Sequence, residues 1–497
     1  MTRVNCLPWP IPWIRCGRKE RLDRANTLLE CFGLVEQVND VVGKSLSTGQ
    51  KRRLAVAEQL VTGPKILFLD EPTSGLDSVA SFHILSHLRA MAKQYNIIVI
   101  CSIHQPSVTM LEQFDKLVLL SKGKTHYFGL VKDVVDYYDS IDVEVPDDVN
   151  PAEFMLSLVN VDFSGSTNLA ASQRLTQLQD LWHASSNAQA TRDQISASQT
   201  TSQTLSAGES LGRQTHKWKR IIPLLHRNLL KALRDNMAYK FRLVMYTGLG
   251  VLMGSIWLRL DHDQSSIQLL INAIVVACGF MAFMAVTYVP AFVEDHQQYK
   301  REHRNGLYGA TLFQVSNFLT GIPFLFLFAL SFSAVFYWLS NGHNSASAFM
   351  TWVMWLFLNL VAAEAVIVAV VAIVPGFTGS LVLAALINVL MFATAGTLVP
   401  PEKLNSFYKY GFYYWNFQTY VFQGMMKTQF NGLLYTCGSQ CLCTYAPTTP
   451  TSCQVSGDVV LDLYGVDVDH QTRNVGFVLA IILGFRLVAW VVIKLKH

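Results

Sequence analysis

The sequence predicts an α/β domain with a parallel sheet, followed by an all-α membrane domain with six spans. Two observations predict this class. Of the 497 residues, 51% are hydrophobic and only 15% are charged, whereas typical soluble domains carry about 25% charged residues. The apolar residues are also unevenly spread: residues 1–235 resemble a soluble protein with a polar tail, while residues 236–497 hold long apolar runs. One soluble module followed by one membrane module is the simplest organisation.

The charges argue against a nucleic-acid partner and indicate membrane topology instead. A net charge of +4 is too small on a chain of this length to form a nucleic-acid footprint. The lysines and arginines gather beside apolar segments, at residues 217–220, 231–242 and 300–304. Residues 1–18 contain Pro and Trp but no apolar core, so they do not form a cleavable signal peptide. They are left unassigned.

Residues 19–163 alternate between helical and strand patterns. Two apolar runs, Ile66–Leu69 and Ile97–Ser102, have the pattern of buried strands. Helical spacing covers residues 19–36, 51–61 and 79–94. This alternation predicts an α/β domain built on a parallel sheet.

A polar segment separates this domain from the membrane module. Residues 164–216 are rich in Ser, Thr, Gln, Asn and Ala, a composition that predicts a mobile linker. In residues 217–235, apolar residues alternate at helical spacing with lysines and arginines. That pattern predicts a basic amphipathic helix lying at the membrane surface.

The membrane domain, residues 236–497, holds six apolar stretches, each long enough for the roughly 20 residues that a bilayer span needs. They lie near residues 241–260, 268–292, 312–338, 349–374, 380–399 and 476–493. With both termini in the cytoplasm, the basic clusters before the first span, between the second and third, and after the last all become cytoplasmic. This agrees with the positive-inside rule.

The same topology places residues 401–473 on the extracellular side, with four of the nine cysteines: Cys437, Cys441, Cys443 and Cys453. An oxidising environment favours disulfides, and four cysteines allow three pairings. Cys441 and Cys443 are too close in sequence for comfortable bridge geometry. Each is therefore expected to pair with Cys437 or Cys453. Free thiols or an intermolecular bridge are the alternative.

The first strand delivers two carboxylates at its carboxyl end. A nucleotide site needs one carboxylate to hold Mg²⁺, here Asp70, and another to polarise the attacking water, here Glu71. Ser47 and the backbone amides near Gly49 open a helix whose positive end suits a phosphate. His104 closes the second strand, where an imidazole can contact a terminal phosphate. Taken singly, His104 is more often a structural histidine, and residues 46–50 an ordinary helix cap.

In this order the motifs resemble the ABC transporter superfamily, and specifically its G subfamily (the white pigment and pleiotropic drug resistance group). LSTGQKRR at residues 46–53 is similar to the signature motif, ILFLDEPTSGLDS at 66–78 to Walker B with the D-loop, and CSIHQPS at 101–107 to the switch-histidine segment. NPAEF at 150–154 resembles the segment that closes the nucleotide domain. YKREHRNGLY at 299–308 and FYYWNFQTYVFQGMM at 412–426 resemble membrane-domain segments, the latter in a form associated with fungal members.

The resemblance implies a P-loop NTPase (ABC ATPase) fold with ATP and Mg²⁺ as cofactors. It implies catalytic roles for Glu71 and His104 and a metal-holding role for Asp70. The residues that it places against the nucleotide are Ser47, Thr48, Gly49, Gln50, Asp70 and Asp77.

One family motif is missing from these residues. A Walker A loop needs Gly-x-x-x-x-Gly-Lys-Ser/Thr after a strand. Gly43-Lys44-Ser45 does not supply it, because the required earlier glycine is Val38. The resemblance therefore implies that this chain lacks the first half of its nucleotide domain. In this family two nucleotide domains clamp ATP head to tail, so a homodimer would hold two signatures and no phosphate cradle. We expect it to be inactive alone and to complete a site only with an intact partner.

Candidate residues of the membrane domain rest on weaker signals. Phe283 falls near the family's aromatic substrate clamp, and Asn388 and Met391 are expected to face the same cavity. Ordinary packing or lipid contact is the alternative. Glu364 lies within span four, where carboxylates are costly and usually face an interior or a partner. Glu302, in the loop after span two, matches a family contact with the nucleotide domain; a solvated charge is the alternative.

Together these features predict an ATP-driven half-transporter of the G type. It would move a lipid, sterol or xenobiotic across a membrane, by family expectation outward, as a multi-pass homodimer or heterodimer with cytoplasmic termini. A different class stays open: a non-catalytic membrane subunit that pairs with an intact half-transporter and regulates it. An incomplete gene model is a third possibility.

Overall fold

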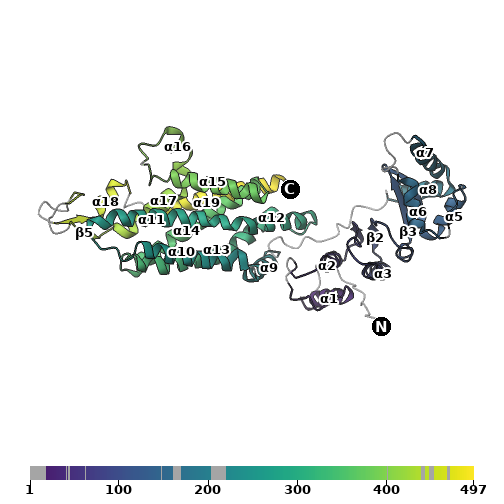
Figure 1. The fold of residues 1–497 in the computed structure, drawn as a ribbon, viewed down its shortest axis with the longest axis horizontal. Helices are drawn as coiled ribbons and strands as arrows, with labels where there is room; N and C mark the ends of the chain where they lie inside the picture. The colour runs from purple at the N-terminus through teal and green to yellow at the C-terminus, as the bar shows by residue number, and fades with distance from the viewer. Residues whose placement is uncertain are drawn as a thin grey trace. The chain divides into compact units, whose positions relative to one another are not determined.

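A computed structural model gives the fold (Figure 1). It describes residues 18–496 except 41, 43–44, 62, 147, 161–168, 203–219, 235, 400, 438–442, 447–452 and 467–470. The chain divides into two compact units, Met1–Arg213 and Gln214–His497. The predictions for residues 1–17, residues 217–219 and Cys441 lie outside the described residues.

The first unit begins with a helical layer on a small parallel sheet. Its elements are α1 (Arg18–Cys31), α2 (Thr48–Val61), β1 (Ile66–Leu69), α3 (Ser78–Tyr95) and β2 (Ile98–Cys101). β1 and β2 pair in parallel, with Ile66 opposite Ile98 and Leu69 opposite Cys101. Because the two strands are parallel, their carboxyl ends meet at one edge of the sheet.

One face of this sheet is uncovered, which differs from the buried strands that the sequence predicts. Leu67 is buried against helices α2 and α3, but Phe68 on the opposite face is 73% exposed. Ile66, Ile98 and Ile100 are exposed on that same face. Parallel sheets are normally covered on both faces. Within the described residues, a helical layer covers one face of this pair alone.

The rest of the first unit packs around an antiparallel hairpin, β3 (Lys116–Ser121) and β4 (Lys124–Leu130). Its two turn residues, Lys122 and Gly123, both have positive φ, as a two-residue hairpin requires. The remaining helices are α4 (Val108–Leu111), η2 (Val131–Asp133), α5 (Val134–Asp139), α6 (Pro151–Val159), α7 (Leu169–Ala184) and α8 (Ser186–Ser202).

Within residues 164–216, where the sequence predicts a mobile linker, the described residues 169–202 form the helices α7 and α8. Trp182 of α7 is buried, and its ring lies 5.6 Å from the rings of both Tyr127 and Tyr137. Leu175 and Leu178 are buried on the same side of the helix. Three large apolar residues at helical spacing are enough to dock a polar helix, although the composition of the whole segment hides them.

The second unit is a helical bundle. It contains α9 (Ile221–Arg234), η4 (Asn236–Phe241), α10 (Arg242–Ile256), α11 (Gln264–Met284), η5 (Ala285–Tyr288), α12 (Val289–Arg304), α13 (Ala310–Leu339), α14 (Ala346–Ile373), α15 (Phe377–Ala393) and α19 (Gln471–Lys496). Figure 1 shows the long helices running side by side, with α14 among them. Most of α14 is buried by its neighbours.

Four helical segments in the described part of the chain are long and apolar enough to cross a membrane: Gln264–Arg304, Ala310–Leu339, Ala346–Ile373 and Gln471–Lys496. α15, at Phe377–Ala393, is apolar but shorter. The first predicted span corresponds to α10, which has 15 residues. In the described part of the chain, four of the six predicted spans therefore correspond to helical segments of sufficient length, and α10 and α15 are shorter.

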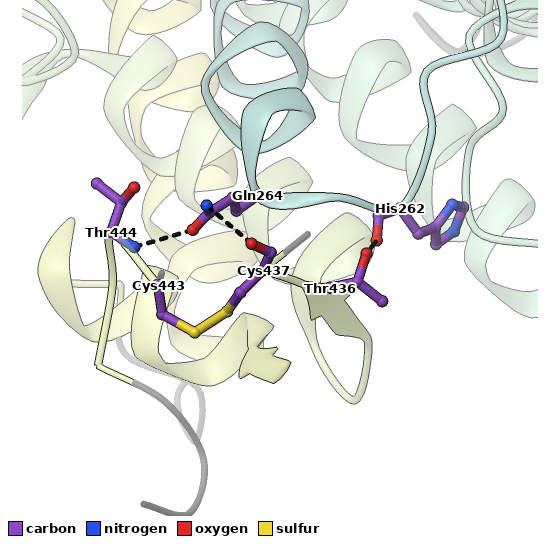
Figure 2. Close-up of a disulfide and its surroundings, with 6 residues drawn as sticks. All are labelled: His262, Gln264, Thr436, Cys437, Cys443 and Thr444. Carbon is purple, nitrogen blue, oxygen red and sulfur yellow. Dashed lines mark hydrogen bonds between the residues drawn. A yellow bond between two sulfur atoms is a disulfide. The ribbon is translucent and has the colours of Figure 1, made fainter. Parts of the chain in front are cut away.

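The segment between α15 and α19 folds into short elements: α16 (Ser406–Gly411), η6 (Tyr413–Trp415), α17 (Phe417–Phe430), β5 (Leu434–Thr436), β6 (Gln454–Ser456) and α18 (Gly457–Leu463). A disulfide joins Cys437 to Cys443, and Cys453 is also disulfide-bonded. The side chain of Gln264, at the start of α11, accepts a hydrogen bond from the Thr444 N–H at 2.8 Å and donates one to the Cys437 carbonyl at 3.4 Å (Figure 2). The loop is thus attached to the first turn of α11.

Candidate functional site

The residues predicted to meet a phosphate form the cap of helix α2. The Ser47 hydroxyl accepts a hydrogen bond from the Gln50 N–H at 3.3 Å, and the Gln50 side chain accepts one from the Ser47 N–H at 2.9 Å. This reciprocal pair is a capping box, which fixes the first turn of a helix. Ser47 and Thr48 stay exposed, and Gly49 and Gln50 are half-buried. The positive end of α2 is therefore formed and accessible.

The two predicted carboxylates lie at the shared carboxyl edge of β1 and β2. Asp70 Oδ1 accepts a hydrogen bond from Ser102 Oγ at 2.6 Å, and Ser102 Oγ accepts one from the Glu71 N–H at 3.0 Å. Ser102 directly follows β2, so strand pairing brings it to the acids. One oxygen of Asp70 is held, while the side chain remains exposed and able to receive a cation.

Glu71 adopts a left-handed backbone conformation, with φ of 45°. This conformation is uncommon and costly for a residue with a side chain. The Glu71 carbonyl accepts a hydrogen bond from Nη1 of Arg52, which lies on helix α2. Arg52 thus links the helix that follows the signature serine to the turn that carries the acids.

The D-loop packs against the signature. Asp77 caps helix α3 by accepting a hydrogen bond from the Ala80 N–H at 2.7 Å. A Cβ atom added at Gly49 would lie 2.5 Å from Cδ2 of Leu76. A glycine at position 49 therefore allows α2 and the D-loop to approach this closely.

His104 lies in the loop after β2, and its side chain is exposed. Among the residues that the structure describes, it makes no hydrogen bond. Its loop is held instead by Asn150, whose Nδ2 donates a hydrogen bond to the Pro106 carbonyl at 2.8 Å and whose Oδ1 accepts one from the Ala152 N–H at 3.0 Å. The Asn-Pro-Ala-Glu-Phe segment thus both starts helix α6 and ties down the switch loop.

Sequence reasoning missed three of these supporting residues: Arg52, Ser102 and the tethering role of Asn150. Ser102 had a detectable signal, since it ends a strand pattern beside the strand that carries Asp70. Arg52 and Asn150 had none, because each reaches a backbone carbonyl whose position depends on folding.

The candidate cavity residues of the membrane unit differ in environment. Phe283 is 42% exposed, whereas Asn388 and Met391 on α15 are buried. The Asn388 side chain donates a hydrogen bond to the Ala384 carbonyl of its own helix at 2.9 Å. At the same packing contact, a Cβ atom added at Gly279 would lie 2.4 Å from the ring of Phe392. α11 and α15 therefore approach closely one turn before Phe283.

Glu302 lies in helix α12, and not in a loop as the sequence analysis placed it. Its carboxylate is buried and accepts hydrogen bonds from Arg227 of α9, from the Tyr308 hydroxyl and from Gln298. A second ion pair, between Lys231 Nζ and Asp295 Oδ1 at 2.6 Å, joins the same two helices. These two pairs hold the amphipathic helix α9 against α12.

Known families match most of the chain. An ABC transporter family matches residues 4–74, and two ABC-2 type transporter families match residues 104–162 and 220–430. Among solved structures, CbiO1 of Clostridium perfringens, part of the ABC transporter complex CbiONQ, is 29% identical and matches 26% of this chain and 51% of that chain, with a TM-score of 0.23.

Curated relatives match between 84% and 98% of this chain. ABC transporter G family member 1 of Petunia hybrida is 32% identical over 430 residues, which cover 84% of this chain and 67% of the relative. G family member 11 of Arabidopsis thaliana is 28% identical over 98% of this chain and 70% of its own length. G family member 1 of Dictyostelium discoideum is 25% identical over 96% of this chain and 70% of its own length. These relatives give no support to the predicted fungal form.

Three observations lead to the same family. They are the order of the motifs, the ABC ATPase segment followed by an ABC-2 type membrane domain, and the identity to the Petunia protein. The chain belongs to the G family of ABC transporters.

Proposed function

We propose that this chain is one half of an ATP-driven transporter that moves an amphipathic lipid, sterol or xenobiotic across a membrane, outward by analogy with its family. Transport would require pairing with a second half-transporter. The spans would lie within residues 236–497 and both termini in the cytoplasm. Six spans are proposed, with α10 and α15 as the shorter two.

The observation that carries this proposal is the shared edge of β1 and β2. There Asp70 and Glu71 of one strand meet Ser102 of the other, while Arg52 connects them to the helix capped by Ser47. Oxygen donors at such an edge suit Mg²⁺, and a capped helix start suits a phosphate. The residues present therefore fit the part of an ATP site that a signature and a Walker B motif provide.

Each residue has a proposed task. Bound ATP would supply the free energy for closing the two nucleotide domains. Ser47, Thr48, Gly49 and Gln50 would contact the phosphates of ATP held by the partner domain. Asp70 would hold Mg²⁺, Glu71 would orient and polarise water, and His104 would contact the terminal phosphate. Asp77 would keep the D-loop turn beside the signature.

Activity is proposed to depend on an intact partner. These 497 residues contain no Gly-x-x-x-x-Gly-Lys-Ser/Thr sequence, so a homodimer of them offers two signatures and no Walker A loop. A partner that carries Walker A could complete one composite site with Ser47 and Gly49. In that arrangement Asp70 and Glu71 would have no Walker A loop beside them.

The membrane residues complete the proposal. Phe283, Asn388 and Met391 would line the substrate path where α11 and α15 meet. Glu302 would act in coupling by fixing α9 on α12, so that movement of one helix reaches the other. The same missing motif favours a second candidate function: a non-catalytic subunit that regulates an intact relative.

The test is ATPase activity in lipid, first of the purified chain alone and then of the chain with an intact G-family half-transporter. We expect no turnover alone and transport only in the mixed complex. Strong hydrolysis by the pure chain that disappears in Glu71→Gln would overturn the requirement for a partner. If the mixed complex transports equally well with Ser47→Ala and Gly49→Ala variants, the regulatory function is favoured over the catalytic one.

A further inference from the structure

A small polar cavity lies in the second unit, apart from the nucleotide motifs and from the proposed substrate path. It is bounded by α9, η4, α12 and α13 and by the last residue of η5. Its lining includes the polar side chains of Lys231, Tyr239, Tyr288, Asp295, Asn317 and Thr320. The cavity is therefore placed where the amphipathic helix α9 meets the helical bundle.

The size of the cavity limits what it can hold. The centre of a water-sized sphere can occupy about 20 Å³ of it. One water molecule needs roughly 10–15 Å³ by this measure. The cavity thus accommodates a single water molecule, and it is too small for a lipid, a sterol or a nucleotide.

One buried acceptor on the cavity wall has no donor from the protein. Asn317 is 7% exposed, and its Nδ2 donates a hydrogen bond to the Tyr288 hydroxyl at 2.9 Å. Within the described part of the chain, no protein group donates to Asn317 Oδ1, which is itself buried. Buried polar atoms of native proteins nearly always have a hydrogen-bond partner. Asn317 Oδ1 therefore requires a donor that the surrounding helices do not supply.

Thr320 offers a second acceptor on the same helix. Its Oγ1 donates a hydrogen bond to the Ser316 carbonyl at 2.8 Å. A hydroxyl oxygen that has donated its hydrogen can still accept through its lone pairs. Residues three apart in a helix share a face, and both Asn317 and Thr320 line the cavity. Two neighbouring acceptors match the two hydrogens of one water molecule.

The charges around the cavity favour a neutral occupant. Lys231 and Asp295 both line it, and Nζ of the lysine lies 2.6 Å from Oδ1 of the aspartate. Because these two charges neutralise each other, the lining has no excess charge that would hold an anion or a cation. Water needs no such excess, and it can donate to a carboxylate and accept from an ammonium group.

We propose that this cavity binds one ordered water molecule, which donates its hydrogens to Asn317 Oδ1 and Thr320 Oγ1 and connects α13 with the ion pair between α9 and α12. Buried waters typically make about three hydrogen bonds to polar groups that otherwise lack partners, and the lining offers that many. The water is then part of the junction of the three helices. Its detection needs neither nucleotide nor substrate, so the test is independent of ATPase and transport activity.

Hydroxyl-radical labelling of the purified full chain in detergent tests the proposal. A brief X-ray pulse generates radicals from water, so a buried side chain is oxidised mainly where bound water lies beside it. Tyr288 and Tyr299 are both 1% exposed, but of the two Tyr288 alone lines the cavity. Tyr299 instead packs against the rings of Phe313 and Tyr308. Mass spectrometry of the peptides should show that Tyr288 is oxidised several times faster than Tyr299.

Two threonine variants provide a matched comparison. Thr320→Val removes an acceptor from the cavity wall while it keeps the shape of the side chain, and it should lower the oxidation rate of Tyr288 several-fold. Thr247→Val is the control. Thr247 Oγ1 also donates to the carbonyl four residues earlier, that of Leu243, at 2.8 Å, but Thr247 belongs to α10 and does not line the cavity. Its loss should leave the rate at Tyr288 unchanged.

A third variant fills the cavity. Ala291 lines it from α12, so Ala291→Val places two further carbon atoms in the space assigned to the water. The oxidation rate of Tyr288 should then fall to that of Tyr299.

Two results would overturn the proposal. One is an oxidation rate of Tyr288 in the unaltered chain that is no higher than that of Tyr299, a comparison that needs no variant to fold. The other is a rate at Tyr288 that Thr320→Val leaves unchanged, or that Thr320→Val and Thr247→Val lower equally. Either outcome of this second kind would show that the label at Tyr288 does not report a water bound to Thr320.

Discussion

The two units of this protein place their charged side chains in opposite environments. In the first, Asp70 and His104 are exposed just after the ends of two strands. Asp70 accepts a hydrogen bond from the Ser102 hydroxyl, and Asn150 binds the loop that carries His104. In the second, Arg242 and Glu364 are enclosed by helices. Exposed charges contribute little to stability and remain available for chemistry, whereas a buried charge makes the fold depend on its partners. Changes in the first unit should therefore affect function, and changes in the second should affect folding.

The largest effect should come from Glu364→Ala. It leaves the buried Arg242 without its carboxylate, and breaking such a pair is expected to cost about 3–5 kcal/mol. Thermal unfolding of the purified chain measures this cost. The matched control is Glu402→Ala, because Glu402 is exposed and its loss should change stability by less than about 0.5 kcal/mol. Equal losses of stability in the two variants would contradict the view that buried charges make the fold depend on their partners and exposed charges do not.

A pair of glycine substitutions sharpens the comparison between the two units. A Cβ atom at Gly424 of α17 would lie 2.0 Å from Cε2 of Trp355, a fully buried ring on α14. Gly424→Ala should therefore separate the helices and cost about 1–3 kcal/mol. In Gly49→Ala the new methyl group meets the flexible end of Leu76. That change should leave stability within about 0.5 kcal/mol, while it weakens the signature. Parallel melting curves of the two variants test this.

A smaller effect is expected at Asn150, whose two side-chain hydrogen bonds can be separated. Asn150→Ala removes both the helix cap and the bond to Pro106, and should cost about 1 kcal/mol. Asn150→Asp keeps the acceptor for the Ala152 N–H but loses the donor to Pro106. The rate of amide hydrogen exchange, measured by mass spectrometry of peptides, should rise in residues 104–110 with both variants. In residues 150–159 it should rise with Asn150→Ala alone. Uniform exchange in both segments would show that Asn150 does not tether the switch loop.

The smallest effect concerns cysteine reactivity. Burial raises the pKa of the Cys101 thiol to about 11. Because the thiolate is the reactive form, alkylation of Cys101 in the folded protein should be very slow at pH 8 and rise about tenfold per pH unit up to that pKa. Cys278, enclosed in the membrane unit, should stay unlabelled over the same range. Mass spectrometry of the alkylated peptides gives both rates, and rapid labelling of Cys101 at pH 8 would contradict its burial.

Much of the candidate site could be predicted from sequence because its signals are local. The capping box of Ser47 and Gln50 spans four residues, and the acids directly follow the apolar run that forms β1. The helical order in α7 was missed for the opposite reason. The composition of residues 164–216 as a whole is polar, and the docking of Trp182 on Tyr127 and Tyr137 joins distant parts of the chain.

The sequence by itself determined the order of the two units, the identity of the motifs and the approximate positions of the apolar helices, because run length, periodicity and cap chemistry act over a few residues. Tertiary structure decided that the Ser102 hydroxyl binds Asp70, that the Asn150 amide binds the Pro106 carbonyl, and that Arg242 and Glu364 lie together. Those contacts depend on strand register and on the rotation of packed helices, and no local pattern specifies either.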